Sequence, residues 1–192
     1  MRNFAIICLL FFTTPVMAAP PNWTIDKTQS SIAFSGTAMS RPFTGHFKNF
    51  DGEIVFDPAQ VKQSHVAITI DTKSVTTDND DANQNIDAPE WLNSAAVPNA
   101  VFKADKFEKR AEGQYIAHGT LTLRGISVPV DLPFTLNIQK TAGSQTAKVT
   151  GEATLHRLDF GLGSGTYSDA KTVGLDVKTQ ISLTARAIAK SN

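Results

Sequence analysis

The sequence predicts an all-β domain, built as a sandwich or an antiparallel barrel of about eight strands, with one or two short helices inserted. Apolar and polar residues alternate in many short segments, and turn residues separate these segments at hairpin spacing. Alternation with a period of two is typical of strands that bury one face. One stretch, 76–99, lacks the alternation. Since the chain shows no internal repeat and no second hydrophobic core, we expect a single domain.

The N-terminus resembles a secretory signal peptide. Arg2 supplies a positive charge, an apolar run follows from Phe4 to Phe12, and Val16-Met17-Ala18 offers a small-residue cleavage pattern, with Ala19 equally suitable as the last residue. The run is too short to span a bilayer. We therefore assign 1–19 to a signal peptide and 20–192 to the barrel domain, and we expect the protein in the periplasm of a two-membrane bacterium.

Individual strands follow from the alternation. It is clearest over 65–72, where Val66, Ile68 and Ile70 face one way. The dipeptide Arg124-Gly125 predicts a two-residue hairpin loop. Strands are expected over 23–26, 31–36, 44–50, 52–56, 65–72, 101–107, 113–123, 126–137, 148–155 and 173–188.

Prolines and polar residues mark the irregular parts. Pro129 and Pro133 place the strand 126–137 at an edge, a bulge or a locally irregular stretch. In 76–99, Asp78 or Asn79 is a candidate N-cap for a short helix. A second helical turn is expected at 89–93, with Pro near its first position.

Composition excludes several classes of protein. Lys and Arg number 18 and Asp and Glu number 18, which argues against a nucleic-acid partner. The single cysteine, Cys8, lies in the signal peptide, so the domain has no disulfide and no thiolate metal site. The four histidines show no metal-ligand spacing, and no Gly-x-Ser-x-Gly motif is present. We therefore expect no metal, no cofactor and no catalytic residue.

Two groups of charged residues have both a structural and a functional interpretation. Arg157 and Asp159 flank Leu158, and alternation places them on one side of an extended segment. A structural ion pair is the favoured interpretation, and a polar group at the mouth of a pocket is the alternative. The same choice is open for Arg41, His46 and Lys48, which lie near two phenylalanines, and the structural interpretation is again favoured.

Nine phenylalanines fall in the domain, mostly at strand positions. A barrel lined by such residues has the same sequence pattern whether its interior is solid or hollow. Packing of an ordinary core is the simpler interpretation of composition alone.

Four blocks run in order along almost the whole domain: WTIDKTQSSIAF at 23–34, GHFKNFDGEIVFD at 45–57, GTLTLRGISVPV at 119–130 and HRLDFG at 156–161. Together they resemble the YceI-like family. The resemblance implies an extended antiparallel lipocalin-like barrel whose tunnel binds a polyisoprenoid or a similar long-chain amphiphile, such as an isoprenoid quinone. It also implies a cytochrome b561-type membrane protein as a partner. The stretch 36–43 departs from the family pattern, because it lacks a histidine that many members carry there.

The tunnel hypothesis assigns residues to the site. Trp91 and Leu92 are expected to form a lid or one tunnel wall. The polar mouth is assigned to Arg41, His46, Arg157 and Asp159. The remaining lining is assigned to Phe34, Phe47, Phe56, Ile68, Phe102, Leu121, Leu123, Phe134 and Leu155.

Two other functions stay open at this point. One is a structural or partner-binding barrel that supports a membrane cytochrome. The other is an enzyme acting on a periplasmic small molecule, which would need an acid, base or nucleophile set that the sequence does not display. The oligomeric state is also open, with a homodimer as one option.

Overall fold

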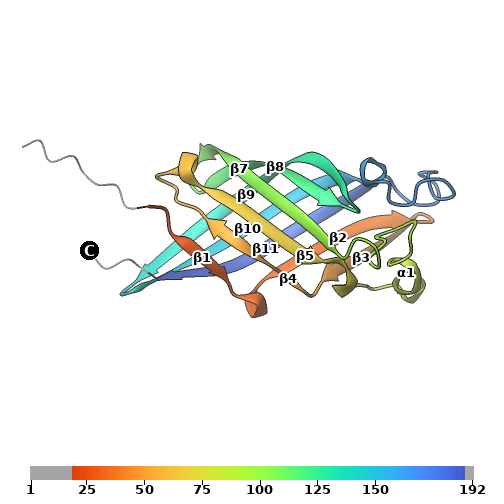
Figure 1. The fold of residues 1–192 in the computed structure, drawn as a ribbon, viewed down its shortest axis with the longest axis horizontal. Helices are drawn as coiled ribbons and strands as arrows, with labels where there is room; N and C mark the ends of the chain where they lie inside the picture. The colour runs from red at the N-terminus through yellow and green to blue at the C-terminus, as the bar shows by residue number, and fades with distance from the viewer. Residues whose placement is uncertain (1–18, 189–192) are drawn as a thin grey trace, which may run out of the picture.

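The structure is a computed structural model that describes residues 19–188. The expected signal peptide, apart from Ala19, lies outside the described residues. The described chain forms a closed, extended antiparallel barrel with a small helix-bearing excursion beside one end (Figure 1). This confirms the lipocalin-like barrel that the sequence predicts.

Within residues 19–188, eleven strand segments form one sheet, in the order β1-β4-β5-β7-β8-β9-β10-β11-β2-β3-β6, and β1 pairs with β11 to close the ring. Three segments continue another after a short interruption, so that the eleven make eight barrel strands. The interrupted strands are β1 (Asn22–Ile25) with β2 (Ser31–Ala38), β3 (Arg41–Phe47) with β4 (Phe50–Val55), and β5 (His65–Asp71) with β6 (Val75–Thr77). The uninterrupted strands are β7 (Asn99–Ala111), β8 (Gln114–Leu123), β9 (Ile126–Thr141), β10 (Ser144–His156) and β11 (Asp176–Ile188).

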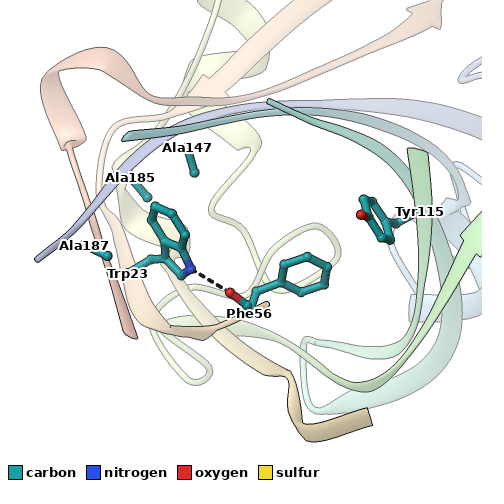
Figure 2. Close-up of a cluster of buried hydrophobic side chains, with 6 residues drawn as sticks. All are labelled: Trp23, Phe56, Tyr115, Ala147, Ala185 and Ala187. Atoms are coloured by element: carbon teal, nitrogen blue, oxygen red, sulfur yellow. Dashed lines mark hydrogen bonds between the residues drawn. The ribbon is translucent and has the colours of Figure 1, made fainter. Parts of the chain in front are cut away.

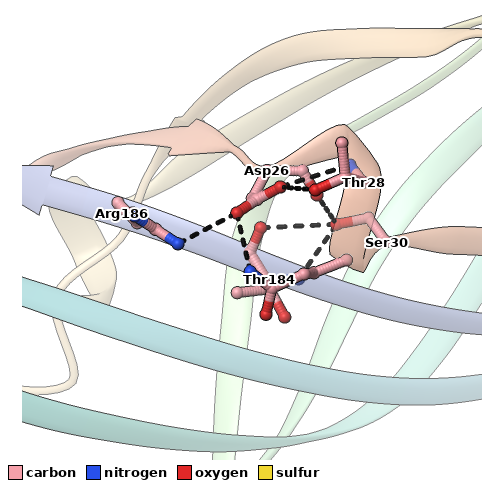
Figure 3. A network of polar contacts seen from close by, with 6 residues as sticks. Asp26, Thr28, Ser30, Thr184 and Arg186 are labelled. Carbon is pink, nitrogen blue, oxygen red and sulfur yellow. Dashed lines mark hydrogen bonds and ion pairs between the residues drawn. The ribbon is translucent and has the colours of Figure 1, made fainter.

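A polar network fixes the first interruption against β11 (Figure 3). The Asp26 carboxylate accepts hydrogen bonds from Thr28 Oγ1 at 2.7 Å and from Arg186 at 3.1 Å. Ser30 Oγ donates to the Asp26 carbonyl at 2.7 Å and accepts from the backbone N–H of Thr184 at 3.0 Å. These bonds replace the ladder that β1 and β2 lose where the chain turns through the 3₁₀ segment Lys27–Gln29.

Two features of the hairpin β8–β9 agree with the sequence prediction: its two-residue turn and the position of its prolines. Arg124 and Gly125 both have positive φ, at 53° and 79°, as a two-residue hairpin loop requires. The register between β9 and β10 ends at the pair Phe134 and Gly151, whereas β8 stays paired with β9 over 126–135. Pro129 and Pro133 therefore lie where β9 has one paired neighbour, as a missing N–H donor demands.

The excursion between β6 and β7 contains one helix, α1 (Asp80–Asn85), where up to two were expected. Asn79 is its N-cap and accepts a hydrogen bond from the Ala82 N–H at 3.0 Å. The predicted second helical turn at 89–93 is a series of hydrogen-bonded turns instead. Asn93 has φ of 50°, a left-handed conformation that ends any helical run there.

The remaining short elements are the 3₁₀ segments η2 (Val61–Gln63), η3 (Thr72–Ser74) and η4 (Arg157–Phe160). The closing strand begins at Asp176, three residues later than Val173, where the sequence placed it. Val173 forms an isolated bridge to Ala38 and so belongs to the loop that precedes the strand.

Candidate ligand-binding cavity

The barrel is hollow. A cavity of about 860 Å³ lies inside it, with lining residues from all eight barrel strands. Such a volume is at the upper end of the range for small-molecule sites, which is about 300–1,000 Å³. The charged lining residues in the described part of the chain are Arg41, Asp81 and Arg157, and nearly all the others are apolar.

The apolar residues assigned to the tunnel all lie on the cavity wall. They are Phe34, Phe47, Phe56, Ile68, Trp91, Leu92, Phe102, Leu121, Leu123, Phe134 and Leu155. The placement of the strand residues among them follows from alternation, which sends every second side chain toward the barrel axis, whereas Trp91 and Leu92 reach the wall from the excursion between β6 and β7.

Glycines beneath two of these phenylalanines keep the interior open. Gly45 lies opposite Phe34 in the β2–β3 register, and a Cβ atom on it would be 2.3 Å from Phe34 Cζ. A Cβ atom on Gly119 would be 2.5 Å from Phe102 Cζ. Both rings therefore lie along the wall, over a backbone without a side chain. Sequence reasoning missed these glycines, although an inward glycine paired with a phenylalanine is a usable signal.

One end of the cavity is closed by a group of residues that we call the floor cluster: Trp23, Phe56, Tyr115, Ala147, Ala185 and Ala187, with Phe107 and Phe134 packed against them. The Phe56 ring is central, with centroid distances of 5.1 Å to Phe107, 5.3 Å to Tyr115 and 5.8 Å to Phe134. Trp23 Nε1 donates a hydrogen bond of 2.9 Å to the Phe56 carbonyl (Figure 2). The cavity reaches Phe56 and Phe107 but not Tyr115.

The other end opens to solvent. The lining there includes Met39, which is 77% exposed, together with the exposed Arg41 and Asp81. These residues come from the β2–β3 hairpin and from α1. The loop 161–175 completes this rim, which we call the mouth, with Tyr167 and Thr172.

Three contacts hold the mouth together. The Met39 N–H donates to the Thr172 carbonyl at 2.8 Å, and the Gly174 N–H donates to the Thr37 carbonyl at 2.8 Å. On the excursion, the Trp91 ring lies 5.2 Å from the Tyr167 ring, measured between centroids. Trp91 is thus part of the cavity wall, at the junction of the excursion and the loop.

Arg157 holds the loop 161–175 in place with its side chain. It is 2% exposed, and its guanidinium donates all five of its N–H groups to backbone carbonyls. The acceptors are Gly174 at 3.0 Å, Leu162 at 2.7 Å, Gly163 at 3.3 Å, Val173 at 2.9 Å and Tyr167. Burial lowers the pKa of the guanidinium from its ordinary value.

The predicted ion pair between Arg157 and Asp159 is wrong. The segment is the 3₁₀ turn η4, where residues two apart do not share a face as they do in a strand. Asp159 is exposed and interacts with His156 at 3.4 Å between Oδ1 and Nδ1. Asp159 is also absent from the cavity wall, so its assignment to the mouth is corrected.

Of the two other residues that the sequence assigned to the mouth, one lines the cavity and the other does not. Arg41 lines the cavity, because it shares the inward parity of β3 with Phe43 and Phe47. His46 has the opposite parity, is exposed on the outer surface and does not line the cavity, which corrects its assignment. Sequence reasoning missed Tyr167, Thr172 and the α1 residues, since loops and a one-turn helix carry no period from which to assign a face.

A histidine outside the cavity lies between two carboxylates. His118 Nδ1 is 2.7 Å from Asp131 Oδ1, and its Nε2 is 3.5 Å from Glu108 Oε2. Within residues 19–188, no group of three or more His, Cys, Asp or Glu side chains is arranged to hold a metal ion. Over the same residues, no helix has the length and apolar character needed to cross a membrane.

Comparison with known proteins identifies the family. The sequence profile of the YceI-like domain matches residues 23–185. The chain belongs to the YceI-like family. Among curated relatives, this YceI-like protein is 28% identical over 163 residues to a UPF0312 protein of Vibrio cholerae, covering 81% of this chain and 86% of that protein. It is 26% identical over 153 residues to a UPF0312 protein of Shewanella baltica, covering 77% and 80%.

Solved structures share the barrel. Burkholderia cenocepacia BcnA superposes with a TM-score of 0.74 at 25% identity, covering 83% of this chain and 98% of that one. A polyisoprenoid-binding domain from Saccharophagus degradans superposes with a TM-score of 0.64 at 17% identity, covering 86% and 98%. At that identity the second likeness shows the fold alone.

Proposed function

We propose that this YceI-like protein binds a long apolar lipid, a polyisoprenoid or an isoprenoid quinone, inside the barrel. One observation carries the proposal: a cavity of about 860 Å³ with an almost wholly apolar wall, closed at the floor cluster and open at the mouth. The polyisoprenoid-binding domain of S. degradans, which has the same fold, supports the choice of ligand.

Desolvation of the tail supplies the driving force. Moving apolar surface out of water stabilises the complex by about 25 cal/mol for each Å² buried, before the cost of association and ordering. Water molecules are poorly stabilised inside this cavity, because an apolar wall offers them few hydrogen-bond partners. A hydrocarbon tail is therefore the occupant that the wall favours.

The head group of the ligand stays at the mouth, beside Arg41. The five N–H groups of Arg157 are already bonded to carbonyls, so they are not available to a ligand. The Arg41 side chain makes no hydrogen bond or ion pair within the described residues. Its guanidinium is thus the cation that a quinone carbonyl or a phosphate oxygen can reach, and it can donate hydrogen bonds to either oxygen.

The cellular setting is part of the same proposal. The signal-peptide pattern at residues 1–19 supports a periplasmic location, where the protein would store a lipid or carry it between membranes. A cytochrome b561-type partner remains a prediction of the sequence resemblance, and a homodimer remains one option for the oligomeric state. If no lipid binds, the two alternative functions are a barrel that binds a partner protein and an enzyme.

Binding to delipidated protein tests the proposal, with solanesol and a prenylquinone as ligands and native mass spectrometry as the readout. Leu121→Trp places an indole ring in the lumen and is expected to weaken binding at least about tenfold while the barrel still folds. Thr120→Trp is the matched control, because Thr120 is the exposed neighbour on the outer face of β8. The proposal fails if the wild type binds neither ligand, or if both variants bind like the wild type.

A further inference from the structure

We infer that the floor cluster sets the length of the lipid tail that the protein accepts, with Phe56 and Phe107 as the stop. This inference rests on the proposed function and adds a determinant of specificity to it. It follows from where the cavity ends and from what holds that end in place.

The cavity ends at a defined layer of side chains. Phe56 and Phe107 are on its wall, together with Trp23, Ala147 and Ala185, whereas Tyr115 and Ala187 of the same cluster are not. Tyr115 is 3% exposed and Ala187 is 5% exposed, so no open space lies against either side chain. A tail that enters from the mouth therefore meets the Phe56 ring before it can leave the barrel.

Three neighbouring rings hold the Phe56 ring in place. The Phe56 ring packs edge-on against Phe107, Tyr115 and Phe134, with interplanar angles of 75°, 84° and 75°. Its backbone carbonyl accepts the hydrogen bond from Trp23. Aromatic rings packed edge to face resist displacement, since each rotation away loses contacts with several neighbours.

The volume sets the scale of the limit. A carbon atom with its hydrogens needs roughly the 30 Å³ that a water molecule takes up in the liquid, so the cavity of about 860 Å³ holds about thirty carbon atoms. That is a tail of about six isoprene units. Shorter tails bury less apolar surface, and in longer tails the extra units stay in water or lift the head group away from Arg41.

The affinity should accordingly rise with tail length and stop rising at the capacity of the cavity. Removing a ring from the stop extends that capacity. The Phe56 ring has about as many carbon atoms as one isoprene unit, so Phe56→Ala is expected to admit about one further unit. Phe107→Ala removes a half-buried ring from the same layer and serves as a second variant that disturbs the core less.

The experiment measures the affinity of delipidated full domain for geranylgeraniol, hexaprenol, solanesol and decaprenol, each titrated separately. We expect the affinity of the wild type to stop rising near hexaprenol, and that point to move to longer prenols in Phe56→Ala and Phe107→Ala. Phe43→Ala is the control, because Phe43 lines the cavity near the mouth and its ring is outside the stop.

Two results would overturn the inference while leaving lipid binding intact. One is a length profile that does not change in folded Phe56→Ala or Phe107→Ala. The other is an equal change in Phe43→Ala. Absence of binding for every prenol in the wild type would instead overturn the proposed function, so the two failures are distinguishable. Thermal denaturation of each variant establishes that the barrel has folded before the titration.

Discussion

Trp23 Nε1 donates a hydrogen bond of 2.9 Å to the carbonyl of Phe56, and this bond joins β1 to the end of β4 at the floor of the cavity. The chain has two tryptophans, and both lie on the cavity wall, Trp23 at the floor and Trp91 near the mouth. The two indoles therefore report on opposite ends of a bound lipid.

The orientation of the ligand can be measured with these reporters. In Trp91→Phe, a lipid brominated at the far end of its tail is expected to quench the fluorescence of Trp23. In Trp23→Phe, the same lipid should leave Trp91 bright, and a bromine beside the head group should quench it. The opposite pattern would show that the head group enters first and would contradict the assignment of Arg41 to the mouth.

Gly45→Ala is expected to reduce the capacity of the cavity. The new Cβ would be 2.3 Å from Phe34 Cζ, so the ring must swing away from the wall and into the lumen. We expect a stability loss of about 1–3 kcal/mol from this overpacking, together with weaker binding of prenols. His46→Ala, at the next and outward-facing position of β3, should change neither; urea denaturation and titration measure both quantities.

Arg157→Lys tests the role of the buried arginine in the loop 161–175. A lysine has three donors without the planar fork, so at least two of the five carbonyls lose their partner. Since each buried orphaned group costs about 1–3 kcal/mol, the free energy of unfolding should fall by more than about 2 kcal/mol. Asp159→Asn should have little effect, because Asp159 is exposed; equal losses in the two variants would restore the ion-pair interpretation.

Asp26 predicts a dependence of stability on pH. The hydrogen bond from Thr28, with a smaller contribution from Arg186, lowers the pKa of Asp26 below its ordinary value of 3.8. A carboxyl group with a lowered pKa in the folded state stabilises the fold above its unfolded pKa, and this contribution disappears as the pH falls through the folded pKa.

We therefore expect Asp26→Asn to lower the thermal midpoint at neutral pH. The difference from wild type should shrink once the pH falls below the ordinary pKa of 3.8. Asp105→Asn, at an exposed position of β7, is the control. A difference that stays constant down to strongly acidic pH would show that the carboxylate charge of Asp26 does not contribute.

The sequence is informative wherever the chain has a period. Alternation assigned Ile68, Leu121 and Phe134 to the interior because a strand sends alternate side chains to opposite faces, and the hairpin at Arg124-Gly125 followed from turn chemistry. The volume left inside the barrel depends on how rings pack across strands. The pairing of Phe34 with Gly45 is set by register between strands, which a single sequence does not reveal.

Irregular segments were harder to predict for a related reason. The sequence predicts an extended segment around Arg157. In the structure the chain turns at η4, and the Arg157 side chain binds carbonyls of the loop 161–175, which the strand pattern does not place near it. Tyr167 lies in that same loop, where no period assigns a face to any side chain. The mouth is built largely from such segments, which is why the wall of the cavity was predicted better than its opening.

The most direct measurement of the central claim is the lipid content of the protein itself. Mature protein is purified from a bacterial host without detergent, extracted with organic solvent and analysed by mass spectrometry alongside a protein assay. We predict one prenyl lipid per barrel in the wild type and far less in Leu121→Trp. An extract without prenyl lipid, or with equal amounts from both proteins, would contradict it.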